Sequence, residues 1–180
     1  MQPRLIGFLS TLLVLISLWI NAALADQITN YIPETQIPKA QKVGEARLSV
    51  LFWDVYDMVL YAPDGAWSYN EPFALSIHYL RKIDGEDIAN RSIEEMRGQG
   101  LQNETLLAQW YKEIKAIFPD VKKGTVLTAI FLPGQRTDFF ENEKLIGTVK
   151  GGDFLHWFSG IWLSDKTSEP ALRKKLLGES

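Results

Sequence analysis

The strand-like and helix-like segments of this chain fall into separate blocks, and this grouping limits the folds that it can adopt. Runs rich in β-branched and aromatic residues come first, at 47–52, 55–62 and 73–81, and two amphipathic helical segments follow. A second block of strands and a second pair of helices complete the chain. Segregated runs predict an α+β domain, an antiparallel β-sheet covered on one face by helices.

Capping and breaking residues mark the expected ends of these segments. Asp84 begins the first helix, and Asp153 is expected to cap the third. Trp53–Asp54 is expected to interrupt the first pair of strands. The remaining expected elements are a helix with an apolar stripe over 106–118, strands at 125–132, 137–141 and 144–149, and a last helix from 169 to Gly178.

The first 25 residues are typical of a secretory signal peptide. Arg4 precedes an apolar run over 5–20, and Ala23 and Ala25 fit the small-residue rule for cleavage before Asp26. The alternative is an uncleaved membrane anchor, but the run is shorter than the ~20 residues that a span prefers. We therefore expect a signal peptide at 1–25, a polar leader at 26–42 and a single domain at 43–180, with no membrane span after cleavage.

Composition narrows the compartment and the partners. The chain has no cysteine, so an exported form relies on packing alone, which favours a bacterial periplasm over a eukaryotic secretory route. Its formal net charge of −3 comes without clusters of basic residues. Such a chain is a poor candidate for binding nucleic acid or anionic membrane surfaces.

Several local sequences, in their order and spacing, resemble the chalcone isomerase fold and in particular its exported bacterial chalcone isomerase-like branch. The resemblance covers about 43–178. It rests on the following pieces: Gly44-Glu45-Ala46-Arg47-Leu48, Val55-Tyr56-Asp57-Met58-Val59-Leu60-Tyr61, the strand 73–81, Leu132-Pro133-Gly134 and Ile161-Trp162-Leu163.

The resemblance implies roles for particular positions. Arg47 is similar to the arginine that meets the ligand in the plant enzyme, and Tyr56 falls near a strand threonine that helps to hold a catalytic water. The enzyme's catalytic tyrosine falls on Ile88, its asparagine on Glu95, and a late ligand-contacting threonine on Ile161. Because three of these polar groups are absent, turnover of chalcones is not expected.

Other chemistry finds little support in the residues. Asp153 and His156 have the helical spacing of a ligand pair, but two ligands are too few for a metal site. Glu94 and Glu95 are neighbours in a helix and point apart, so a solvated face explains them better than acid–base catalysis. No phosphate-binding loop or nucleophile motif is present, and we expect no metal and no cofactor.

The function expected from sequence is therefore ligand binding rather than catalysis. Non-catalytic members of the resembled family bind fatty acids, pairing an arginine with the carboxylate while an apolar cleft takes the chain. We expect a small amphipathic ligand, with Arg47 at its head, Tyr56 assisting, and Ile88 and Ile161 in the cleft. The alternatives are that Arg47 pairs with Asp54 or Asp57, that the protein is an isomerase or lyase on another substrate, or that it is an envelope interaction module whose Trp67 and Tyr69 meet a partner.

Overall fold

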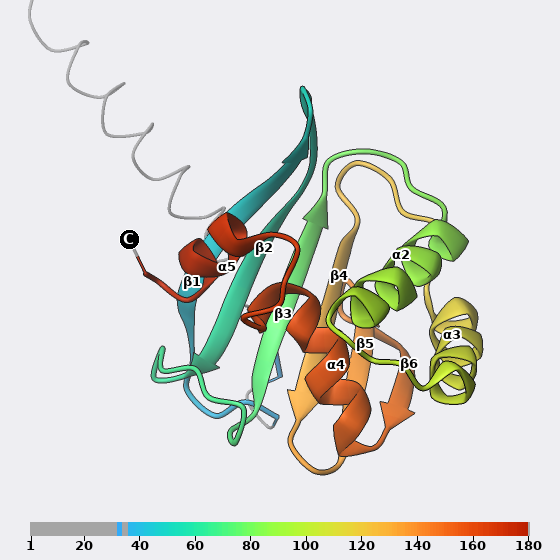
Figure 1. Cartoon of the computed structure of the whole chain (residues 1–180). Coiled ribbons are helices and arrows are strands. Elements are labelled where there is room, and N and C mark those ends of the chain that lie inside the picture. The colour runs from blue at the N-terminus through green and yellow to red at the C-terminus, as the bar shows by residue number, and fades with distance from the viewer. Residues whose placement is uncertain (1–31, 34–35, 180) are drawn as a thin grey trace, which may run out of the picture. The chain divides into compact units, whose positions relative to one another are not determined.

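The computed structural model describes residues 32–33 and 36–179, so the predicted signal peptide lies outside the described residues. The domain consists of strands and helices in separate blocks (Figure 1). In chain order they are β1 (Ala40–Val50), β2 (Trp53–Pro63), β3 (Phe73–Tyr79), α2 (Gly85–Gly98), α3 (Glu104–Ile117), β4 (Val126–Leu132), β5 (Arg136–Glu141), β6 (Lys144–Lys150), α4 (Gly152–Leu163) and α5 (Pro170–Leu176).

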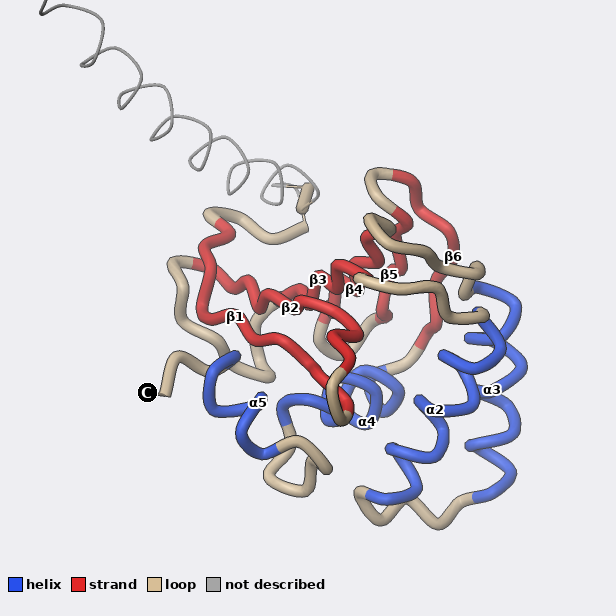
Figure 2. The backbone as a smooth tube through the Cα atoms, turned by 90° about the horizontal axis from the view of Figure 1, so that it is seen from above, coloured by secondary structure: helices blue, strands red, loops and turns tan. Residues whose placement is uncertain are grey.

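The six strands form one antiparallel sheet in which spatial order equals chain order, from β1 to β6. The four helices of the described residues lie together on one face of this sheet (Figure 2). The predicted α+β class, with helices on one face, is confirmed. Within the same residues, none of the helices combines the length and the apolar character that crossing a membrane requires.

The first strand pair differs from the prediction. β1 begins at Ala40 rather than at Arg47, and the hairpin turns at Leu51–Phe52 instead of breaking at Trp53–Asp54, with Val50 paired to Trp53. The turn consists of two large apolar residues and contains none of the Gly, Pro, Asn or Asp residues that mark a turn in sequence. This turn and a β-bulge at Val55, where the register shifts between Ser49 and Leu48, together set which side chains of β1 and β2 are paired.

The start of α4 also differs from the prediction. The residue before the helix is Gly151, whose φ of 102° suits glycine, and Asp153 lies in the first turn without a side-chain capping bond. The prediction that Asp153 caps the helix is therefore wrong. Its carboxylate still lies at the helix N-terminus, where a negative charge is favourable.

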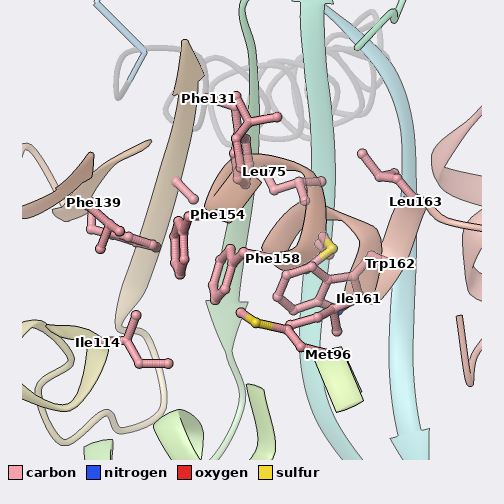
Figure 3. Close-up of a cluster of buried hydrophobic side chains, with 14 of the residues drawn as sticks. Leu75, Met96, Ile114, Phe131, Phe139, Phe154, Phe158, Ile161, Trp162 and Leu163 are labelled. Carbon is pink, nitrogen blue, oxygen red and sulfur yellow. The ribbon is translucent and has the colours of Figure 1, made fainter. Parts of the chain in front are cut away.

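Large aromatic side chains fill the space between the sheet and α4 (Figure 3). The rings of Phe154 and Phe158 stack at 5.2 Å, and Phe139 meets Phe158 edge-on at 5.3 Å. Phe118, from the end of α3, packs edge-on against Phe139 at 5.1 Å. The contacts of Phe139 with Phe154 and Phe158 hold α4 against β5.

At the other side of the sheet, α5 packs on β1 through a close backbone approach. A Cβ atom added to Gly44 would lie 2.2 Å from the carbonyl oxygen of Lys175. Only glycine allows this approach, so Gly44 seats the last helix beside the first strand pair.

Candidate functional site

A cavity of about 500 Å³ lies between the sheet, α2 and α4. Its walls are mainly aliphatic and aromatic side chains. They come from five strands (Leu48, Val50, Val55, Tyr56, Leu75, Ile77, Tyr79, Leu127, Thr128, Ala129, Phe139), from α2 and α4 (Ile88, Ser92, Phe158, Ile161, Trp162), and from the connecting segments (Ile83, Phe118). The volume and character are those of a small-molecule site.

Strand alternation decides which residues of the first hairpin reach the cavity. Leu48 is paired with Tyr56 across β1 and β2, and both line the cavity. Because successive side chains on a strand point to opposite faces, Arg47 and its partner Asp57 face away from it.

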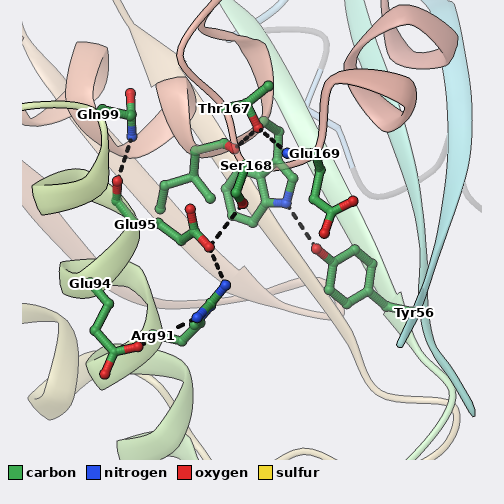
Figure 4. A network of polar contacts seen from close by, with 10 residues as sticks. Tyr56, Arg91, Glu94, Glu95, Gln99, Thr167, Ser168 and Glu169 are labelled. Atoms are coloured by element: carbon green, nitrogen blue, oxygen red, sulfur yellow. Dashed lines mark hydrogen bonds and ion pairs between the residues drawn. The ribbon is translucent and has the colours of Figure 1, made fainter. Parts of the chain in front are cut away.

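Polar side chains gather along one edge of the cavity (Figure 4). The indole Nε1 of Trp162 donates to the hydroxyl oxygen of Tyr56 at 2.9 Å. Ser168, in the segment before α5, donates to a carboxylate oxygen of Glu95 at 3.0 Å, and Arg91 forms an ion pair with the same carboxylate. This network ties α2, α4 and the segment before α5 to the edge of β2.

The hydroxyl of Tyr56 is placed to donate a hydrogen bond. Burial raises the pKa of Tyr56 to about 12, against a weaker opposing effect of the Trp162 hydrogen bond, so the phenol keeps its proton at neutral pH. Among the described residues, no group accepts the hydrogen bond from this hydroxyl. The proton is therefore available to a ligand in the cavity.

Most of the charged residues that line the cavity are negative. Arg91 brings one positive charge, whereas Asp87, Glu95 and Glu169 bring three negative charges. Arg91 is already paired with Glu94 at 3.5 Å and with Glu95, and two thirds of its side chain are exposed. An anionic ligand head would have to share this guanidinium with carboxylates. In the described part of the chain, no cluster of three or more side chains could hold a metal ion.

Three of the four predicted ligand-binding residues line the cavity. Tyr56, Ile88 and Ile161 are brought together there from β2, α2 and α4, and Glu95, the position of the enzyme's asparagine, joins them. Arg47 is not among the lining residues. A role for Arg47 in ligand binding stays a prediction.

Arg47 has carboxylate partners on the outer face of the hairpin. Its guanidinium donates to Asp57 at 2.6 and 2.9 Å and to Asp54 at 2.8 Å. The hydrogen bonds and charges of these aspartates, Asp57 foremost, raise the pKa of Arg47. The pairing that the sequence left open as an alternative is thus the one observed.

Trp67 and Tyr69, the aromatics of the interaction-module alternative, lie in the segment between β2 and β3. Both are half-buried, their rings meet at 4.7 Å, and both pack edge-on against Phe73. An interaction module would need both rings exposed, but the loop that carries them packs against the core.

Sequence reasoning missed Arg91, Trp162 and Ser168. A helical signal could have found the first, because Ile88, Arg91 and Glu95 are spaced by three and four residues and share one face of α2. No local signal points to Ser168, which reaches the site only through the path of the chain between α4 and α5.

Comparisons with known proteins agree with this architecture. Residues 41–178 match a family model described as chalcone isomerase-like. A protein of Haemophilus influenzae, whose name states no function, is 31% identical over 141 residues, which are 78% of this chain and 69% of the relative. The crystal structure of a fatty-acid binding protein from Arabidopsis thaliana superimposes with a TM-score of 0.62 at 13% identity, over 81% of this chain and 90% of that chain.

Proposed function

Because the chain belongs to the chalcone isomerase-like family, we propose that it binds a small amphipathic ligand, such as a fatty acid, in the cavity between the sheet, α2 and α4. The observation that carries the proposal is the cavity itself, about 500 Å³ with apolar walls and one polar edge. A protein of the same fold is named a fatty-acid binding protein, which supports this ligand class.

The apolar walls are suited to the chain of the ligand. Leu75, Ile77 and Ala129 from the sheet face Ile88 and Ile161 from the helices across the cavity. Moving an aliphatic chain from water into such a space stabilises the complex by about 0.8 kcal/mol for each buried CH₂ group. We propose that this burial supplies most of the affinity.

The polar edge is suited to the head of the ligand. In the proposed complex, the Tyr56 hydroxyl donates a hydrogen bond to a head-group oxygen while it accepts one from Trp162. Arg91 adds a positive charge beside it. We thus propose Arg91, rather than Arg47, as the cation nearest to the head.

The charges at the edge bear on the kind of head group. Asp87, Glu95 and Glu169 repel a carboxylate, and Arg91 offsets only part of that repulsion. A neutral oxygen head, as in a fatty alcohol, keeps the Tyr56 hydrogen bond without this penalty. We expect hexadecanol to bind at least as tightly as palmitate at pH 7.

A displacement titration tests the proposal. The purified protein is stripped of lipid, loaded with a fluorescent fatty acid, and titrated with palmitate or hexadecanol in vesicle-free solution. Tyr56→Phe should weaken both ligands about fivefold, because each loses one hydrogen bond of about 1 kcal/mol. Arg91→Ala should weaken palmitate more than hexadecanol. Ser92→Leu, which places an aliphatic side chain into the cavity, should weaken both at least ~10-fold.

Arg47→Ala is the matched control, because it removes an arginine outside the cavity lining. Its affinity should stay within about twofold of the wild type, since it alters only exposed ion pairs. If Arg47→Ala weakens palmitate more than Arg91→Ala does, Arg47 and not Arg91 meets the head. If neither palmitate nor hexadecanol displaces the probe, the proposed function is wrong.

We also propose that the protein is exported to a bacterial periplasm and acts without catalysis. Support for export comes from the pattern of residues 1–25. Support for a non-catalytic role comes from Ile88, an apolar residue at the position of the enzyme's catalytic tyrosine. Fractionation of cells with an antibody tests the first part, and turnover of a chalcone by the purified protein would contradict the second.

A further inference from the structure

The large exposed hydrophobic side chains of the described residues are concentrated at one place. Leu51 and Phe52, at the tip of the β1–β2 hairpin, are 88% and 97% exposed, and Trp53 and Val50 beside them are 65% and 53% exposed. The only other such residue in the described ranges is Leu145, on β6. The hairpin tip, residues 50–53, projects beyond the neighbouring strands (Figure 1).

The backbone at the hairpin tip is strained as well as apolar. Leu51 has a φ of 56°, at the first central position of a two-residue turn. Glycine adopts this conformation freely, whereas a leucine side chain there meets steric resistance. A strained, exposed leucine followed by an exposed phenylalanine does not stabilise the fold. Such a combination indicates a functional surface.

The hairpin tip is continuous with the cavity. Val50 belongs to the tip and also lines the cavity, and Val55 lines it from the returning strand. An apolar path thus runs from the exposed Leu51 and Phe52 past Val50 to the interior.

The charges around the hairpin tip suit a phospholipid surface. Asp54 and Asp57 are held by Arg47, and Asp84 is paired with Lys82 at 3.4 Å. Arg81 lies 5.6 Å from the ring centre of Trp53 and forms no ion pair with the carboxylates of the described residues. A tryptophan with a neighbouring cation at the end of an apolar projection is the combination found at membrane–water interfaces, where the cation meets lipid phosphate.

We propose that the hairpin tip inserts into the interface of a phospholipid bilayer. The inserted residues are Leu51, Phe52 and Trp53, with the Arg81 guanidinium at the level of the lipid phosphates. Insertion brings Val50, and with it the cavity, against the lipid surface, so that an amphiphile passes between bilayer and cavity without crossing water. The proposal of docking depends only on the properties of the hairpin tip, whereas the proposed transfer of an amphiphile also rests on the proposed function.

A site-specific fluorescent label tests the docking. Since the chain has no cysteine, Phe52→Cys creates a single labelling position for an environment-sensitive fluorophore. With vesicles of phosphatidylcholine and phosphatidylethanolamine, emission from this label should rise, shift to the blue, and be quenched by a spin-labelled lipid. The matched control is Leu145→Cys, a hydrophobic position with 52% exposure on β6, whose label should not respond.

A second variant measures the contribution of the hairpin tip to the affinity for vesicles. The double substitution Leu51→Ser and Phe52→Ser should weaken the response of a label at Trp53→Cys at least ~10-fold in lipid concentration, because two large apolar side chains no longer leave water. Both positions are exposed, so the domain should keep its circular dichroism spectrum and its affinity for monomeric palmitate in vesicle-free solution.

Four results would overturn the docking proposal. The first is that the label at position 52 does not respond to vesicles, and the second is that the double variant leaves the affinity for vesicles unchanged. The third is that the labels at 52 and 145 respond alike. In the fourth, the label at 52 responds to increasing protein concentration without lipid, in which case the hairpin tip binds a second copy of the chain. Loss of palmitate binding in vesicle-free solution bears on the proposed function only, so the two proposals fail separately.

Discussion

The sheet and its helices enclose two regions that are built from the same layers and packed very differently. Beside β5, the rings of Phe139, Phe154 and Phe158 pack closely against one another between the sheet and α4 (Figure 3). Toward β1–β3, aliphatic residues such as Leu75 and Ile77 face Ile88 on α2 across a cavity of about 500 Å³, and Phe139 and Phe158 form the wall of that cavity on the aromatic side. Amphipathic patterning creates both regions, and the volume of the side chains decides which one can take a ligand.

The largest expected loss of stability comes from a substitution among the packed aromatic rings. Phe154→Ala should lower the free energy of unfolding by about 3–5 kcal/mol, because the fully buried ring leaves a void among its neighbours. Ile77→Ala, whose side chain already borders the cavity, should have less than half that effect. Urea denaturation of both variants measures the difference, and equal losses would mean that the two regions are packed alike.

Alkaline pH probes the polar edge of the cavity. Burial raises the pKa of Tyr56 to about 12, from 10 in the unfolded chain, so the folded state holds this proton more tightly. The contribution of protonated Tyr56 to the free energy of unfolding is fully present below pH 10 and is lost as the pH rises from 10 through 12. Between pH 10 and pH 12, Tyr56→Phe should therefore lose about 2–3 kcal/mol less of its free energy of unfolding than the wild type does. Urea denaturation at several pH values measures this difference.

Tyr61, whose pKa burial likewise raises to about 12, is the comparison for this experiment. Tyr61→Phe should reduce the alkaline loss of stability in the same direction but leave ligand affinity unchanged, since Tyr61 is not among the cavity residues. If Tyr56→Phe leaves the pH dependence unaltered, the phenol is not buried as described.

Filling the cavity should change binding without a large change in stability. Ser92→Leu replaces a hydroxyl that donates to the Ile88 carbonyl at 2.8 Å by an aliphatic group that extends into the cavity. We expect the free energy of unfolding to stay within about 1 kcal/mol of the wild type, because new apolar contacts offset the lost hydrogen bond. A loss above this, measured by urea denaturation, would mean that the cavity has no room for the leucine.

The smallest expected effect lies outside both regions. Arg47→Ala removes exposed ion pairs with Asp54 and Asp57, so the free energy of unfolding should fall by no more than about 1 kcal/mol at low salt and by less at high salt. Thermal unfolding at two salt concentrations measures this. A larger loss that ignores salt would indicate a structural role for this arginine beyond its charge.

The fold was predictable because its signals are local. The alternation of Phe73, Leu75, Ile77 and Tyr79 is visible in the sequence, and so is the apolar stripe of α3, and their order predicts the observed class. The first turn was not predictable because Leu51 and Phe52 are residue types typical of strands, and the left-handed φ of Leu51 has no sequence signature.

The site was predictable only in part, for a related reason. Tyr56, Ile88 and Ile161 were found through a family resemblance, but the cation of the cavity was not. Sequence resemblance favours Arg47 as the ligand-binding cation because of its neighbours in the chain. Arg91 lies among exposed charged residues of a helix, a pattern typical of a solvated face. Ser168 joins the site through a segment whose path no local pattern describes.

The sequence by itself determined the alternation, the helices and therefore the α+β architecture, because these depend on the spacing of apolar residues along the chain. Only the tertiary structure decided which arginine meets the cavity. The turn at Leu51–Phe52 and a β-bulge at Val55 together pair Leu48 with Tyr56 and Arg47 with Asp57. With Leu48 lining the cavity, Arg47 beside it faces outward. Because side chains alternate along a strand, a register shifted by one residue would exchange the faces, and no local pattern of residues fixes that shift.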